Sequence, residues 1–124
     1  MDYHKHKKQN MPHFVLDCSE KILDKKIPNE VIEEVFKVAV SSGLFKTEDV
    51  KVRINPFKHY TTGGSDDDFI HVFANIMEGR TTEQKAELSA SVVSKLKAMF
   101  PEVPILSMNI RDFEKATYCN KSMV

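Results

Sequence analysis

Residues 11–19 read Met-Pro-His-Phe-Val-Leu-Asp-Cys-Ser, and the regular patterning of this 124-residue chain starts within that stretch. The six residues from His13 to Cys18 are mostly apolar and β-prone, which predicts a short buried strand. Pro12 precedes them directly, and the first residue of an edge strand tolerates the missing backbone donor of proline. Considered alone, this proline is therefore an ordinary strand-opening residue.

The segment before this strand has a different composition. Residues 1–10 (MDYHKHKKQN) mix histidine and lysine and hold no aliphatic side chain beyond Met1, and a second methionine follows at Met11. We interpret residues 1–11 as a leader or a misassigned start outside the fold. Residues 12–124 then form one domain, because 41% hydrophobic content over this length is enough for a single core.

The charge balance limits the partners that the chain can have. Lys plus Arg and Asp plus Glu both number 18, so the formal net charge is zero, which argues against nucleic acid or an anionic membrane as a partner. No stretch approaches the roughly 18 apolar residues of a membrane span, and no signal-peptide core is present. Cys18 and Cys119 lack metal-ligand spacing, so we expect free thiols in a cytoplasmic protein.

The first half of the domain has a strand–helix–strand pattern. Residues 19–27 are polar and lysine-rich and are expected to form a loop, and Asn29 then offers an N-cap for a helix that ends at Gly43. Residues 50–54 alternate apolar and basic side chains, as a strand with one wet face does. The apolar stripe expected for the helix consists of Ile32, Val35, Phe36 and Ala39.

The second half repeats this order after a polar connection over residues 55–68. Residues 69–77 are expected to form a strand, and Thr81 with Gln84 predicts a capping box for the next helix. Its apolar stripe consists of Leu88, Val92, Leu96 and Met99, and Pro101 ends it. Residues 105–111 predict the last strand, and the tail to Val124 is weakly patterned.

Two strand–helix–strand units imply two parallel strand pairs with right-handed crossovers. We therefore predict an α+β fold in which tandem β-α-β units form a four-stranded mixed sheet with two helices on one face. Nothing in this chain is left to cover the other face. Association of several copies through that face is the expected solution.

This architecture fits two families, the ferredoxin-like binding domains and the tautomerase superfamily. The sequence of residues 11–19 closely resembles the start of 5-carboxymethyl-2-hydroxymuconate isomerases, which belong to that superfamily and assemble as trimers. The resemblance covers essentially everything from Pro12 onward. Its other matching motifs are Gly43-Leu44-Phe45, Asp68-Phe69-Ile70-His71 and Gly79-Arg80.

The resemblance implies that Pro12 is the catalytic base. An initiator methionine before proline is normally removed, which would leave Pro12 as a chain start with a secondary amine. Burial beside cations lowers the pKa of such an amine below its usual value of roughly 7.7 to 8.0. A neutral amine can take the 2-hydroxyl proton of a dienol and return it to a distal carbon, an enol-to-keto shift that needs no cofactor and no metal.

The substrate of that family is a small polycarboxylate, so the resemblance also implies cationic contacts. Arg80 precedes the N-cap Thr81 and is a substrate-binding candidate together with Lys51 and Arg53, which share one face of their strand. The family tends to have arginine at both strand positions, and Lys51 departs from this pattern. Lysine supplies a point charge without the two-pronged grip of arginine, which leaves open another unsaturated acid as the substrate.

Two further residues complete the candidate site. His13 neighbours the base and is expected to line the pocket, and Phe69 is a candidate apolar wall, although core packing explains it equally well. His71 lies mid-strand and is interpreted as a packing residue. A third reading, a non-catalytic ferredoxin-like module for ligand binding or assembly, remains open, because only an enzyme of this type would need a free amine at Pro12.

Overall fold

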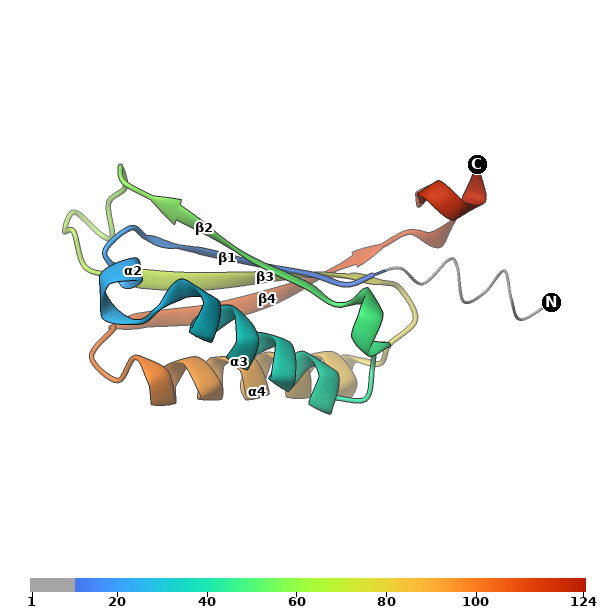
Figure 1. Cartoon of the computed structure of the whole chain (residues 1–124), viewed down its shortest axis with the longest axis horizontal. Helices are drawn as coiled ribbons and strands as arrows, with labels where there is room; N and C mark the ends of the chain where they lie inside the picture. Colours follow the sequence, from blue (N-terminus) through green and yellow to red (C-terminus); the bar gives the residue numbers. More distant parts are fainter. Residues whose placement is uncertain (1–10) are drawn as a thin grey trace.

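A computed structural model describes residues 11–124 as a four-stranded sheet with two long helices packed on one face (Figure 1). The interpretation of residues 1–11 as a leader falls almost entirely outside the described residues. The strand order is β2-β1-β3-β4. The strands are β1 (His13–Ser19), β2 (Lys51–Phe57), β3 (Phe69–Met77) and β4 (Ile105–Phe113).

The pairing of the strands confirms the tandem arrangement. β1 runs parallel to β2, and β3 runs parallel to β4, as two strand–helix–strand units require. The central strands β1 and β3 are antiparallel, so the sheet is mixed. The start of β1 therefore lies beside the end of β3, and the two units begin at opposite ends of the sheet.

The two long helices are α3 (Pro28–Ser41) and α4 (Thr82–Met99). The capping box predicted for α4 is present, and the stripe of Leu88, Val92 and Leu96 is buried. For α3 the expected N-cap was wrong and the expected apolar stripe was right in part. Ile27 is the N-cap of the helix and Pro28 is its first residue, because the fixed φ of proline suits the first helical position. Asn29 therefore lies inside the helix. The buried stripe consists of Val31, Val35 and Ala39, so two of the four expected residues are confirmed, whereas Ile32 and Phe36 are only partly buried.

The shorter elements correct the expected loops. Residues 19–27 were expected to be irregular, but Ile22 is fully buried and lies in the single-turn helix α2 (Ile22–Lys25). β2 continues through Asn55 and Pro56, which is possible because an edge strand has one side without a partner. Three 3₁₀ turns complete the described chain: η1 (Thr47–Asp49), η2 (Lys115–Thr117) and η3 (Lys121–Met123).

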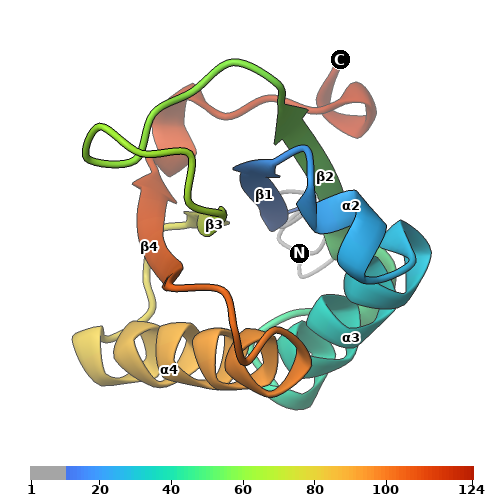
Figure 2. The ribbon, with the colours of Figure 1, turned by 90° about the vertical axis from the view of Figure 1, so that its left-hand side faces the viewer.

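The sheet has one covered and one open face. The core lies between the sheet and the two helices, which cover the same side in both views (Figures 1 and 2). Alternate residues of each strand point away from the helices, and we call this side the open face. Its side chains are His13, Val15 and Asp17 of β1, Lys51, Arg53, Asn55 and Phe57 of β2, Phe69, His71, Phe73 and Asn75 of β3, and Ile105, Ser107, Asn109, Arg111 and Phe113 of β4.

The β2–β3 connection is anchored at the end of the sheet where β1 finishes. It arches over the open side in Figure 2. The hydroxyl of the buried Ser19 donates to the Asp68 carboxylate at 2.9 Å and accepts from the backbone N–H of Phe69 at 3.3 Å. The same carboxylate pairs with Lys25 at 3.6 Å and Lys21 at 3.9 Å. We call this region the Asp68 end.

Candidate functional site

Pro12 is buried and lies at the opposite end of the sheet, directly before β1. Its carbonyl accepts a hydrogen bond from the backbone N–H of Lys51 at 3.1 Å, which places the first residue of β2 beside it. Met11 is also buried, with 4% of its surface exposed, and the end of β3 lies alongside. We call this region the Pro12 end; it contains the starts of β1 and β2 and the ends of β3 and β4.

His13 and Arg53 form a hydrogen-bonded pair on the open face. The Nη1 of Arg53 lies 3.0 Å from the Nδ1 of His13. A guanidinium can only donate, so His13 accepts at Nδ1, and its proton in the neutral ring is on Nε2. Burial lowers the pKa of His13, and the positive charges of Lys51 and Arg53 lower it further. The imidazole, one residue from Pro12, therefore favours its neutral form.

Lys51 lies beside this pair on the same face, directly across from His13 in the register. Its ammonium donates to the backbone carbonyl of Asp49 at 2.6 Å, which orients the charge at the start of β2. Burial raises the pKa of the Asp49 carboxyl itself. The structure thus brings together Pro12 and three of the expected contact residues: His13, Lys51 and Arg53.

Arg80 lies at the same end but on the helix side of the sheet. Gly79 adopts a φ of +122°, a conformation that favours glycine, and the chain turns there before α4. The Arg80 guanidinium donates to the carbonyls of Leu44 at 2.5 Å and Met77 at 3.3 Å, and it lies 5.1 Å from the ring centroid of Phe45. Much of its donor capacity is therefore used to hold the α3–β2 connection against the end of β3.

Phe69 is not near Pro12 within one chain. It is the first residue of β3, and β3 runs antiparallel to β1, so Phe69 lies at the Asp68 end. Its ring contacts that of Tyr60 at a centroid distance of 5.3 Å. His71 has side-chain partners on both ring nitrogens, Ser107 at 2.7 Å and Asn109 at 2.6 Å, as a packing histidine does.

The sequence analysis did not single out Arg111, which lies near the end of β4 on the open face. With it, all three arginines of the chain belong to the Pro12 end. None of the ion pairs found among residues 11–124 involves an arginine. The alternation of residues 105–111 could have placed Arg111 on this face, but its neighbours across the sheet depend on the strand register.

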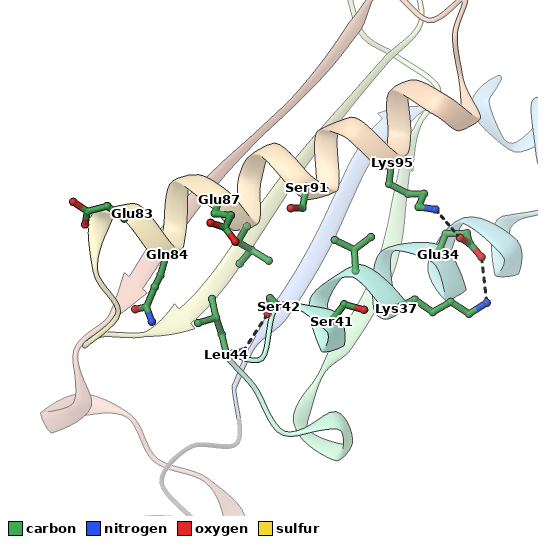
Figure 3. A pocket seen from close by; sticks show the side chains of 12 residues that line it. Glu34, Lys37, Ser41, Ser42, Leu44, Glu83, Gln84, Glu87, Ser91 and Lys95 are labelled. Atoms are coloured by element: carbon green, nitrogen blue, oxygen red, sulfur yellow. Dashed lines mark hydrogen bonds and ion pairs between the residues drawn. The ribbon is translucent and has the colours of Figure 1, made fainter.

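A hollow of about 560 Å³ lies elsewhere, between α3 and α4 (Figure 3). Its cationic side chains, Lys37 and Lys95, both pair with Glu34, at 3.4 and 3.3 Å. Glu83 and Glu87 add negative charge to the same walls. A carboxylate would be repelled there, so this groove does not suit the anionic ligand expected from the sequence.

Residues 11–124 contain neither a metal-binding cluster nor a membrane-spanning helix. No group of three or more histidine, cysteine, aspartate or glutamate side chains in this part of the chain could hold a metal ion. No helix in the same residues is long and apolar enough to cross a membrane. Cys18 is buried and Cys119 exposed, and neither forms a disulfide.

The part of the chain that forms the fold is also the part that matches known proteins. The family model described as 5-carboxymethyl-2-hydroxymuconate isomerase matches residues 12–124. The chain belongs to this family. Membership makes it an isomerase, and the match begins at Pro12. Curated protein sequences gave no match.

Solved structures share the fold of this family member at low sequence identity. A 5-carboxymethyl-2-hydroxymuconate isomerase from Deinococcus radiodurans R1 is 23% identical, with a TM-score of 0.79 over 92% of this chain and 90% of that chain. A 5-carboxymethyl-2-hydroxymuconate delta-isomerase is 16% identical, with a TM-score of 0.75 over 93% and 90% of the two chains. A fused 4-OT protein, solved as an asymmetric trimer, is also 16% identical, with a TM-score of 0.73 over 88% and 92%.

Proposed function

We propose that the chain converts 5-carboxymethyl-2-hydroxymuconate into its 2-oxo isomer, in the cytoplasmic breakdown of homoprotocatechuate, with the amine of a processed Pro12 as general base. The observation that carries this proposal is the position of Pro12 at the start of β1, beside His13, Lys51 and Arg53. A buried amine in a positive potential has a lowered pKa and is a free base near neutral pH.

The reaction moves one proton and leaves the atom count unchanged. The Pro12 amine takes the proton of the 2-hydroxyl, and the oxygen lone pair becomes the second bond of a carbonyl. The π electrons shift along the diene, and the resulting prolinium returns the proton to a distal carbon. Lys51 and Arg53 stabilise the negative charge that develops on the substrate between these steps.

The remaining candidates take supporting roles in this proposal. His13 contributes its Nε2–H as a donor to the substrate, since Nδ1 is occupied by Arg53. Arg80 contributes its charge from the helix side and its N–H groups that are not used by the two carbonyls. Phe69 lines the site only if a neighbouring copy of the chain supplies it.

A homotrimer formed through the open face would supply that neighbour. Neither long helix lies on this face, which the β2–β3 connection crosses at one end (Figure 2). It carries exposed apolar side chains at both ends, including Phe57, Ile105 and Phe113. Two fused 4-OT proteins of similar fold were solved as trimers. The sequence left two alternatives open: an enzyme for another unsaturated acid and a non-catalytic module. The following experiment distinguishes between them.

The proposal predicts that turnover requires a free amine on Pro12. With residues 1–11 attached, the Pro12 nitrogen is a tertiary amide and cannot accept a proton. We expect the enol-to-keto rate of the full chain to be about 10²- to 10⁴-fold below that of a protein starting at Pro12, which is the usual contribution of a general base. Intact mass defines each chain start, and absorbance of the dienol gives the rate.

A control separates the loss of the base from misfolding. Chemical acetylation of the trimmed protein at Pro12 should abolish turnover without changing the thermal midpoint. Equal rates for the full and trimmed chains would contradict the mechanism. Absence of turnover in both, with every dienol acid offered, would favour the binding module.

A further inference from the structure

Arg111 lies in the same row of the open face as His13. The register pairs His13 with Lys51 on one side and with Asn75 on the other, and it pairs Asn75 with Arg111. This row crosses all four strands at the Pro12 end and has a cation at each edge. Two strand spacings, about 10 Å, separate the backbones of His13 and Arg111.

The Arg111 guanidinium is held in place without using its N–H groups on a carboxylate. Its central carbon lies 4.4 Å from the ring centroid of Phe73, a cation–π contact. That ring meets the imidazole of His71 edge-on at 4.5 Å, and His71 is fixed by its two side-chain partners. Stacking leaves the donor edge of the guanidinium available to an anion.

The charges around Arg111 favour an anionic partner. The neighbouring Asp112 points to the other side of the sheet and pairs with Lys85 at 2.9 Å. No carboxylate of residues 11–124 forms an ion pair with Arg111. The other member of the row between it and His13, Asn75, is uncharged and can donate a hydrogen bond to a ligand lying across the strands.

We propose that Arg111 is a specificity-determining residue that binds the third carboxylate of the substrate, the one on the carboxymethyl group. This inference rests on the function proposed above. Lys51 and Arg53 both belong to β2 and serve the carboxylates nearest the base, whereas Arg80 lies on the helix side of the sheet. Arg111 is the guanidinium on the opposite edge of the open face, and its fork suits a carboxylate bidentately.

The test compares two acids that differ in that one group. The trimmed protein is assayed with 5-carboxymethyl-2-hydroxymuconate and with 2-hydroxymuconate, which lacks the carboxymethyl carboxylate. We expect Arg111→Gln to raise the KM for the tricarboxylate about tenfold more than it raises the KM for 2-hydroxymuconate, because one charged hydrogen-bonding contact is lost. Arg111→Lys should recover part of this difference. Lys97→Gln, which removes an exposed positive charge from α4, is the matched control and should change neither KM.

Equal effects of Arg111→Gln on the two acids would overturn the inference. So would a fall in kcat with both acids, or a change in the assembled state on size-exclusion chromatography, because Arg111 would then hold the fold or another copy of the chain. If the trimmed wild-type protein isomerises neither acid, the proposed function has failed. Arg111 is then judged by calorimetric titration with propane-1,2,3-tricarboxylate and glutarate. Selective weakening of the tricarboxylate by Arg111→Gln supports the inference, and no difference overturns it.

Discussion

At one end of the sheet, β1 begins after Pro12 near Arg53 and Arg111, which form no ion pair with the carboxylates of residues 11–124. At the other end, β3 begins after Asp68, whose carboxylate binds Ser19, Lys21 and Lys25. The two ends are equivalent in topology, because each is the start of a strand–helix–strand unit. They differ in the ion pairs found among residues 11–124: Asp68 pairs with Lys21 and Lys25, whereas Arg53 and Arg111 pair with no carboxylate there.

This difference separates scaffold from site. The side chain of Asp68 is only 15% exposed, and its partners remove the need for water or a ligand. At the Pro12 end, Arg53 donates to a neutral imidazole and Arg111 stacks on a phenyl ring, so neither charge is balanced by an acid there. A region that concentrates unbalanced positive charge in a chain of zero net charge is prepared for an anion.

Among three substitutions that test this comparison, the largest effect is expected for Arg53→Gln, which removes a charge from the Pro12 end. Losing hydrogen bonds between a guanidinium and a carboxylate costs about 1.5–3 kcal/mol, so kcat/KM should fall about 10- to 100-fold. The thermal midpoint should stay near that of the wild type, because the side chain is exposed. Steady-state kinetics and a melting curve check both statements. A large loss of stability at unchanged kcat/KM would show that Arg53 holds the fold and does not bind substrate.

The next effect is expected for Asp68→Ala, which removes the anchor of the other end. The Ser19 hydroxyl is buried and would lose its acceptor, so the free energy of unfolding should fall by about 1–3 kcal/mol while kcat per folded molecule is retained. Asp67→Ala is the matched control, since the Asp67 carboxylate is exposed. Denaturant unfolding of the two variants measures the difference, and equal midpoints would show that Asp68 is not an anchor.

The smallest effect concerns the pH dependence of stability at the Pro12 end. The folded-state pKa of His13 is lowered by burial and, to a smaller extent, by Lys51 and Arg53. As the pH falls, the unfolded chain therefore takes up a proton on this histidine at a higher pH than the folded chain does. Stability from this group is complete above the ordinary histidine pKa of about 6.5 and is lost as the pH falls from there towards the folded-state pKa. His13→Gln should make the fall in thermal midpoint below this pH shallower, and parallel profiles for the two proteins would contradict it.

The sequence predicted the sheet and α4 well, because alternation in strands and a capped apolar stripe are local signals. For α3 it identified Val35 and Ala39 of the buried stripe but missed Val31, because the packing against the sheet and not the local pattern decides which neighbouring apolar residue is fully covered. It also ended β2 too early, because Asn55 and Pro56 are turn-prone residues and their tolerance on an edge strand is a property of the sheet order.

The site also divides into features that local sequence signals predict and features that depend on the sheet. Lys51 and Arg53 could be placed on one face from their spacing, and their proximity to Pro12 follows from the parallel pairing of consecutive strands. The row that joins His13 to Arg111 could not be predicted, because it depends on the register of two further strand pairs. The carbonyl contacts of Arg80 depend on how the α3–β2 connection lies against the end of β3, which no local pattern encodes.

The internal position of the second strand opening, at Asp68, has a consequence for the number of catalytic groups in the proposed mechanism. Of the two matching strand openings in each polypeptide, the one at Asp68 is embedded between peptide bonds, so its nitrogen stays an amide whatever processing the chain undergoes. Under the proposed mechanism each polypeptide can therefore supply one proline amine, and the second strand opening serves as a structural joint held by Asp68.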